Sequence, residues 1–210
     1  IGAMSKKIVH VVGTGTIGEP LIGILSTFRE PFGIDEVTFH KRTPLLTDRS
    51  KVNVLGQKGA KLCVDKERWQ KFKEMGMEPH YEAEEAIDRA NVVIDCTPVG
   101  NENKEKYYKR YTGNGRGFIA QGSEYGFGKM YARGINDKAL EKGSDQFVQV
   151  VSCNTHNLAV LIDTIALGPE KEDNLEEGRF VCMRRANDLS QEGDFIPAPE
   201  VGKHDDPRFG

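Results

Sequence analysis

The stretch Ile8-Val9-His10-Val11-Val12 runs directly into Gly13-Thr14-Gly15-Thr16-Ile17-Gly18, and this junction decides the fold. Residues 8–12 are rich in β-branched side chains and are typical of a short buried strand. A helix is expected from Glu19, because Pro20 is tolerated in a first helical turn and apolar residues follow it. Residues 37–40 predict a second strand, which completes a strand–helix–strand unit.

The three glycines of the turn suit a bound dinucleotide. Gly13 permits the tight turn, Gly15 lets the backbone approach a pyrophosphate, and Gly18 lets the helix pack closely on the sheet. The helix N-terminus supplies unpaired N–H groups and a partial positive charge for the phosphates. A glycine-rich turn that binds nothing is the alternative, but the flanking strand and helix favour a dinucleotide site.

Strands and helices alternate along the rest of the chain. This order predicts an α/β fold with a Rossmann-like, doubly wound parallel sheet. Strands are expected at residues 92–96, 118–122, 146–152 and 179–185, and helices at residues 65–75, 83–90, 103–111 and 157–166. We expect residues 4–152 to form an NAD(P)-binding Rossmann domain, followed by a partial α+β catalytic domain at residues 153–210.

The composition of the 210 residues is that of a globular protein, with 38% hydrophobic residues and a net charge of −3. This charge argues against a general nucleic-acid binder, which usually carries a basic face. The chain has no apolar run of membrane-spanning length, no signal-peptide layout and no C-x-x-C pair. We therefore expect no membrane association, no metal site and a cytoplasmic location. Residues 1–3 precede Met4 and are expected to be a cloning remnant.

The second strand is followed by His40-Lys41-Arg42-Thr43-Pro44, a basic turn without an acidic residue. A fold of this kind that prefers NAD usually ends its second strand with Asp or Glu, which binds the ribose 2′-hydroxyl. Lys41, Arg42 and Thr43 instead favour the 2′-phosphate of NADP as cofactor, with NAD still possible. A solvated basic turn without a ligand is the alternative.

Cys153 lies where a strand gives way to a helix, within Val150-Val151-Ser152-Cys153-Asn154-Thr155. A thiol at this junction lies in the field of the helix N-terminus, which favours the reactive thiolate. Cys153 is therefore the candidate nucleophile, whereas Cys96 and Cys182 are interpreted as core residues.

Together these elements resemble the archaeal-type (type II) glyceraldehyde-3-phosphate dehydrogenases. The resemblance covers about residues 6–190 and rests on motifs in the order of the family, namely residues 13–18, Asp95-Cys96-Thr97-Pro98-Val99-Gly100, Gln121-Gly122, residues 150–155 and Arg184-Arg185-Ala186. It implies oxidation of D-glyceraldehyde 3-phosphate to 1,3-bisphosphoglycerate with inorganic phosphate and NADP or NAD. It also implies a place in glycolysis or gluconeogenesis and a homo-oligomer, a tetramer in the family.

The resemblance implies roles for individual residues. Cys153 would attack the aldehyde to give a thiohemiacetal and, after hydride transfer, a thioester that inorganic phosphate releases. The substrate would be bound by Ser152, Asn154, Thr155 and Arg184. The cofactor would be contacted by Gly13, Gly15, Thr16, Ile17, Gly18, Lys41, Arg42, Thr43, Thr97, Pro98, Gly100, Gln121, Gly122 and Arg185.

Two features depart from the family. Ser-Cys-Asn-Thr is usually followed by Thr-Gly, whereas His156-Asn157 follow here, and His156 either pairs with Cys153 or points to solvent. Members of the family are much longer, and their substrate and catalytic-base histidines lie further along, so His204 is one candidate replacement. Two alternatives therefore stay open: another acylating (semi)aldehyde dehydrogenase, or a truncated nucleotide-binding protein without turnover.

Overall fold

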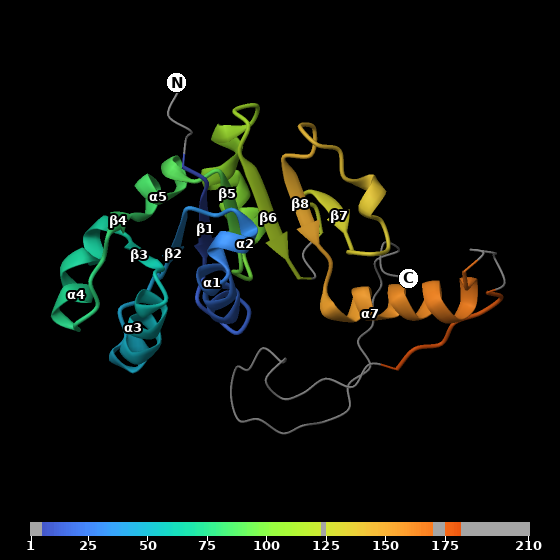
Figure 1. The fold of residues 1–210 in the computed structure, drawn as a ribbon, viewed down its shortest axis with the longest axis horizontal. Coiled ribbons are helices and arrows are strands. Elements are labelled where there is room, and N and C mark those ends of the chain that lie inside the picture. Colours follow the sequence, from blue (N-terminus) through green and yellow to red (C-terminus); the bar gives the residue numbers. More distant parts are fainter. Residues whose placement is uncertain (1–5, 123–124, 170–174, 182–210) are drawn as a thin grey trace.

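The computed structural model of the chain describes residues 6–122, 125–169 and 175–181. Within these ranges one eight-stranded sheet forms the centre, and every neighbouring pair of strands is parallel (Figure 1). Its order is β4-β3-β2-β1-β5-β6-β8-β7. The strands are β1 (Ile8–Val12), β2 (Glu36–His40), β3 (Lys61–Val64), β4 (Tyr81–Glu82), β5 (Val92–Asp95), β6 (Gly117–Gln121), β7 (Lys129–Tyr131) and β8 (Phe147–Val150).

Helices connect most of these strands. They are α1 (Gly18–Thr27), α2 (Arg29–Phe32), α3 (Arg49–Gln57), α4 (Trp69–Glu74), α5 (Ala83–Arg89), α6 (Gly100–Asn103) and α7 (Cys153–Leu161). π-helical turns at Lys104–Tyr108 and Ile162–Leu167 continue α6 and α7. Short 3-10 turns lie at Leu46–Asp48, Lys66–Arg68, Lys109–Tyr111 and Asp137–Ala139. Among the helices that the structure describes, none combines the length and hydrophobicity that crossing a membrane requires.

The helices cover both faces of the sheet, and each face has its own apolar core. On one face α1 and α3 bury Ile22, Val52 and Leu55 against strand residues such as Phe39. On the other face α5 and the helical turns after α6 pack over β5 and β6, where Phe118 is fully buried. Burial of one such side chain contributes about 1.5–3 kcal/mol. The structure thus confirms the predicted doubly wound α/β fold.

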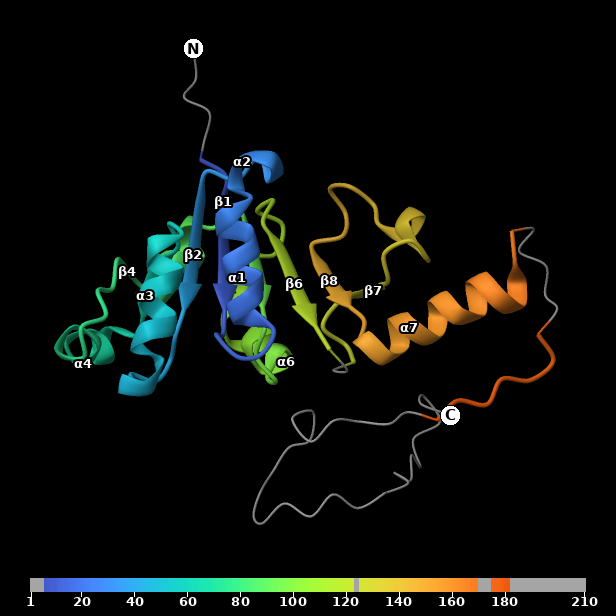
Figure 2. The same cartoon turned by 60° about the horizontal axis from the view of Figure 1, so that its bottom comes forward.

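Parallel pairing places the carboxyl ends of all strands at one edge of the sheet. In Figure 2 the arrowheads of β6 and β8 point to this edge, where α7 begins. The chain leaves β1 towards β2 on one side and returns later as β5 on the other side. The carboxyl ends of β1 and β5 therefore form the topological switch point, where ligands bind in sheets of this kind.

Several elements differ from the sequence prediction. The short strands β3, β4 and β7 were not expected; β4 and β7 span only two and three residues, which is too few for a recognisable alternation. The helix expected from residue 157 already begins at Cys153. The strand expected at residues 179–185 is wrong for 179–181, which pair with no other strand that the structure describes, and its remaining residues lie outside the described ranges. The domain boundary at residue 152 stays a prediction.

Candidate active site

The glycine-rich turn after β1 has the geometry of a phosphate-binding loop. Gly13 has a φ of +97°, and its N–H donates to the carbonyl oxygen of His40 at 3.2 Å. A Cβ on Gly18 would lie 2.0 Å from the carbonyl oxygen of Gly13, so the close packing of α1 on the turn requires glycine there. A Cβ on Gly15 would meet no atom within 4 Å. Packing among the described residues therefore does not demand glycine at residue 15, whereas close approach of a ligand would demand it.

The start of α1 leaves donors for an anion. Thr16 and Ile17 are exposed at the tip of the turn. Ile17 is the N-cap residue, and its apolar side chain makes no capping hydrogen bond. The N–H of Glu19 already donates to the carbonyl oxygen of Gly15 at 3.1 Å, and Pro20 has no N–H, so the N–H of Gly18 is the donor left at the start of the helix among the described residues. This donor, together with the positive end of the helix dipole, fits a pyrophosphate and hence a dinucleotide.

The basic turn after β2 contains a feature that the sequence did not reveal. Lys41 is buried, and its Nζ lies 2.5 Å from Oδ2 of Asp48, whereas Arg42 and Thr43 are exposed. The carboxylate of Asp48 thus neutralises one of the two cations assigned to a 2′-phosphate. The contact was missed because Asp48 lies seven residues further along, beyond a 3-10 turn.

The same edge holds a second polar contact, between the ends of β2 and β3. Nε2 of His40 lies 3.0 Å from Oδ1 of Asp65, and this hydrogen bond, together with nearby Arg68 and Arg42, holds the pKa of Asp65 below its usual value. Nη1 of Arg68 donates to the carbonyl oxygen of Arg42 at 2.5 Å. A carboxylate therefore does lie near the end of β2, but it comes from the neighbouring strand and is already paired.

A buried carboxylate shapes the loop after β5. Asp95 is 1% exposed; its Oδ1 accepts hydrogen bonds from the N–H and the hydroxyl of Thr97, at 2.8 and 2.6 Å. Its Oδ2 accepts from Nδ2 of Asn103 and from the hydroxyl of Tyr108, at 2.8 and 2.7 Å. Burial and the Asp95 carboxylate both raise the pKa of Tyr108, which therefore remains a donor. An aspartate two residues before a threonine signals such a turn, but Asn103 and Tyr108 have no comparable signal.

The other residues predicted on this loop and on the loop after β6 lie at the same edge. Pro98 is exposed, and Gly100 is the buried first residue of α6. Gln121 ends β6, and Gly122 follows it with a φ of +105°. Nε2 of the fully buried Gln149 donates to the carbonyl oxygen of Gly122 at 3.2 Å, which ties this loop to β8.

Cys153 is the first residue of α7, and its side chain is exposed. Ser152 caps the helix: its Oγ accepts a hydrogen bond from the N–H of Thr155 at 3.2 Å and lies 2.9 Å from that residue's hydroxyl oxygen. The Sγ of Cys153 lies 4.0 Å from Oδ1 of Asn154. Nε2 of His156 lies 2.9 Å from the carbonyl oxygen of Arg133, so this ring nitrogen is occupied away from the thiol.

The other described cysteines differ sharply from Cys153. Cys63 is buried and Cys96 is half-buried. Burial raises the pKa of both thiols to about 12, and the neighbouring Asp95 adds to the shift at Cys96. Both are therefore inert thiols at neutral pH. Cys182 lies outside the described residues.

The sheet brings most of the predicted site residues to one edge. The turn after β1 and the start of α7 after β8 are three inter-strand steps of about 4.8 Å apart, or roughly 14 Å. The loops after β5 and β6 lie between them. Arg184, Arg185 and His204 lie outside the described residues, so their assigned roles stay predictions.

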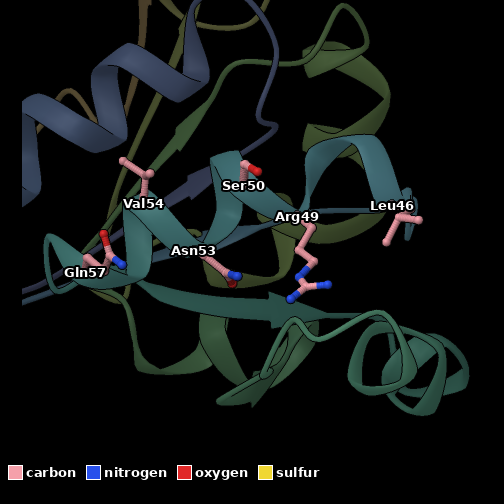
Figure 3. Close-up of a pocket in the computed structure, with 6 residues that line it drawn as sticks. All are labelled: Leu46, Arg49, Ser50, Asn53, Val54 and Gln57. Carbon is pink, nitrogen blue, oxygen red and sulfur yellow. The ribbon is translucent and has the colours of Figure 1, made fainter.

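A surface hollow of about 560 Å³ lies elsewhere, along one side of α3 (Figure 3). Its lining residues are Leu46, Arg49, Ser50, Asn53, Val54 and Gln57. None of these was predicted to bind cofactor or substrate, and the hollow does not include the turn after β1 or Cys153.

Comparison with known proteins gives a consistent sequence relationship. A glyceraldehyde-3-phosphate dehydrogenase of Pyrobaculum arsenaticum is 29% identical over 203 residues, which cover 91% of this chain and 54% of the relative. The corresponding enzyme of Sulfolobus acidocaldarius is 33% identical over 190 residues, or 88% of this chain and 50% of the relative. This chain is a relative of the archaeal glyceraldehyde-3-phosphate dehydrogenases. It spans about half the length of the curated relatives it matches.

Two other comparisons add little to this relationship with the glyceraldehyde-3-phosphate dehydrogenases. No family model matches the chain. Among solved structures, an imine reductase from Pseudomonas sp. matches 55% of this chain and 32% of its own, with a TM-score of 0.34 and 22% identity. That overlap is too small to support an argument about fold or function.

Proposed function

We propose that this chain binds a nicotinamide dinucleotide and contributes the nucleophile for the phosphorylating oxidation of D-glyceraldehyde 3-phosphate to 1,3-bisphosphoglycerate. The observation that carries the proposal is the shared edge of the parallel sheet. There a glycine-rich turn suited to a pyrophosphate and an exposed cysteine at a helix start lie roughly 14 Å apart, a span that an extended dinucleotide bridges. The relationship to named dehydrogenases supports the choice of reaction.

The described residues would hold the two ends of the cofactor. The turn from Gly13 to Gly18 would bind the pyrophosphate, and Thr97 with Gly122 would flank the nicotinamide side. The cations at the end of β2 favour NADP, with NAD accepted as well. When bound, the oxidised nicotinamide supplies the acceptor for the hydride that a thiohemiacetal carbon loses on becoming a thioester.

Cys153 would carry the covalent chemistry. Its thiolate adds to the aldehyde carbon, the carbonyl oxygen takes up the negative charge, and a thiohemiacetal forms. Asn154 and the N–H groups of Cys153 and Asn154 would stabilise that oxygen. After oxidation, inorganic phosphate attacks the thioester carbon, the C–S bond breaks, and the acyl phosphate leaves with Cys153 restored as a thiolate. Ser152 and Thr155, hydrogen-bonded to each other, hold the helix start in place.

Two other functions remain candidates for specific reasons. Another acylating (semi)aldehyde dehydrogenase would use the same cofactor fold and the same cysteine chemistry. A nucleotide-binding chain without turnover is favoured by one observation, because within the described residues no imidazole is hydrogen-bonded to Cys153. The family's oligomeric state and cytoplasmic location stay predictions.

A steady-state assay separates these functions. Purified chain is mixed with glyceraldehyde 3-phosphate, inorganic phosphate and NADP or NAD, and reduced nicotinamide is followed by absorbance. The proposal expects reduction that needs phosphate and disappears in Cys153→Ser. Reduction with a semialdehyde but not with glyceraldehyde 3-phosphate would favour the second function. Nucleotide binding without reduction from either aldehyde would favour the third.

A further inference from the structure

At the carboxyl edge of β2 and β3, some basic side chains contact a carboxylate and others do not. Lys41 and His40 each contact a carboxylate, Asp48 and Asp65 respectively, at 2.5 and 3.0 Å. Arg42 is exposed and has no carboxylate within ion-pair distance among the described residues. Lys41 is therefore less available to a ligand than Arg42.

Arg68 adds a cation that the sequence did not indicate. It follows β3, the neighbour of β2, and its Nη1 donates to the carbonyl oxygen of Arg42 at 2.5 Å. Its Nε lies 3.7 Å from Oδ2 of Asp65, beyond the range of a good hydrogen bond. The guanidinium of Arg68 thus braces the turn and retains donor capacity beside Arg42.

We infer that Asp48 sets the nucleotide selectivity of this chain by holding Lys41 away from the nucleotide, so that Arg42 and Arg68 supply the positive charge for a 2′-phosphate. The inference rests on the proposed binding of a nicotinamide dinucleotide. In this arrangement the chain binds NADP through Arg42 and Arg68 without Lys41, and NAD therefore competes with NADP for the site. Release of Lys41 adds one charged donor that only NADP uses.

The test is a binding titration rather than an activity assay. Dissociation constants of NADPH and NADH are measured by nicotinamide fluorescence for the wild-type chain and its variants. Asp48→Ala is expected to raise the affinity for NADPH relative to NADH by roughly tenfold, the scale of one charge-assisted hydrogen bond. Glu67→Ala removes another carboxylate, from the turn after β3, and is expected to leave the ratio unchanged.

A double variant separates release of Lys41 from loss of a negative charge. In Lys41→Gln/Asp48→Ala the gain is expected to disappear, because the freed amine is absent. If the gain persists in the double variant, Asp48 acts only by repelling the phosphate and the inference is wrong. If Asp48→Ala leaves the ratio unchanged, the inference is also wrong.

Arg68 provides a second test, which holds even if Asp48→Ala does not fold. Arg68→Gln is expected to weaken NADPH binding by roughly tenfold and NADH binding by much less. Lys66→Gln, which removes a highly exposed cation from the same turn, is the matched control and is expected to change neither. Equal losses for both nucleotides in Arg68→Gln would contradict the inference. If the wild-type chain binds neither nucleotide, the proposed function is wrong as well. This result differs from one in which the wild-type chain binds nucleotides but the variants leave selectivity unchanged, which contradicts only the inference about Asp48.

Discussion

The hydroxyl of Tyr108 donates a 2.7 Å hydrogen bond to Oδ2 of Asp95 and so fixes, from a helical turn, the carboxylate that shapes the loop after β5. Tyr108 is 1% exposed and its ring stacks on Phe118, with centroids 5.0 Å apart. The buried carboxylate in turn holds Thr97 through two hydrogen bonds. The packing of one face of the sheet is thereby coupled to the loop after β5, which lies at the carboxyl edge of the sheet.

Tyr108→Phe is expected to lower the free energy of unfolding by about 1–3 kcal/mol, because a buried carboxylate oxygen loses one of its donors. The same variant is expected to weaken nucleotide binding, because the loop that holds Thr97 is less ordered. Urea denaturation and a nucleotide titration measure the two effects. Tyr107→Phe, at a more exposed neighbouring position, is the control, and equal effects in both variants would show that the Asp95 contact is unimportant.

Gly15 and Gly18 are expected to respond to alanine in opposite ways. Gly18→Ala places a Cβ 2.0 Å from the carbonyl oxygen of Gly13 and is expected to cost about 1–3 kcal/mol of stability through overpacking. Gly15→Ala meets no atom and is expected to leave stability unchanged or to raise it by up to about 1 kcal/mol. Only Gly15→Ala is then expected to lose nucleotide affinity without loss of stability. A stable Gly15→Ala chain with wild-type affinity would argue against a pyrophosphate at this turn.

Cys153 is expected to react with iodoacetamide at neutral pH much faster than Cys63 or Cys96. Cys153 is exposed at a helix start, whereas burial raises the pKa of the other two thiols to about 12. Peptide mapping by mass spectrometry, carried out on native chain in a Cys182→Ser background, measures the three rates. Comparable labelling of Cys96 would contradict the structure of the loop after β5. Protection of Cys153 by bound nucleotide would further support a shared site.

His10 is expected to make stability depend on pH. It is fully buried in β1, Nδ1 lies 2.7 Å from the hydroxyl of Thr38, and burial lowers the pKa of His10 from 6.5 to about 3. The unfolded chain therefore binds a proton below pH 6.5 that the folded chain does not bind until about pH 3. The contribution of neutral His10 to the free energy of unfolding is complete above pH 6.5 and falls by about 1.4 kcal/mol per pH unit below that value.

Denaturant titrations between about pH 7.5 and pH 5 measure how the free energy of unfolding changes as the pH falls through 6.5, the value below which the contribution of His10 declines. His10→Gln is expected to remove the slope, whatever its own stability. His80→Gln, at an exposed position, is expected to retain it. A wild-type slope in His10→Gln would show that other groups cause the pH dependence.

The sequence predicted the elements in which local pattern and tertiary structure agree. The β-branched strand before Gly13 and the glycine-rich turn are local signals, and both occur as expected. The strand before Cys153 is also confirmed, although the helix begins four residues earlier than expected, because Ser152 caps it. Caps of this kind extend a helix into polar residues whose own propensity for helix is low.

The contacts that join distant elements could not be read in the same way. The pairing of Lys41 with Asp48 and of His40 with Asp65 depends on how two turns fold back on the carboxyl edge. Composition marked the turn after β2 as basic, whereas the structure shows that part of its charge is already neutralised. The strand β7 is three residues long and pairs with β8, a contact that so short a run of sequence does not signal.

Formation of an acyl group on Cys153 is the most direct test that this residue is the nucleophile. Chain is mixed with NADP and glyceraldehyde 3-phosphate in the absence of inorganic phosphate, quenched in acid, and analysed by intact-mass and peptide-level mass spectrometry. One acyl adduct on Cys153 is expected, formed together with an equal amount of reduced nicotinamide, and none is expected in Cys153→Ser. Chain that binds NADP and glyceraldehyde 3-phosphate yet leaves Cys153 unmodified and the nucleotide oxidised would contradict this expectation.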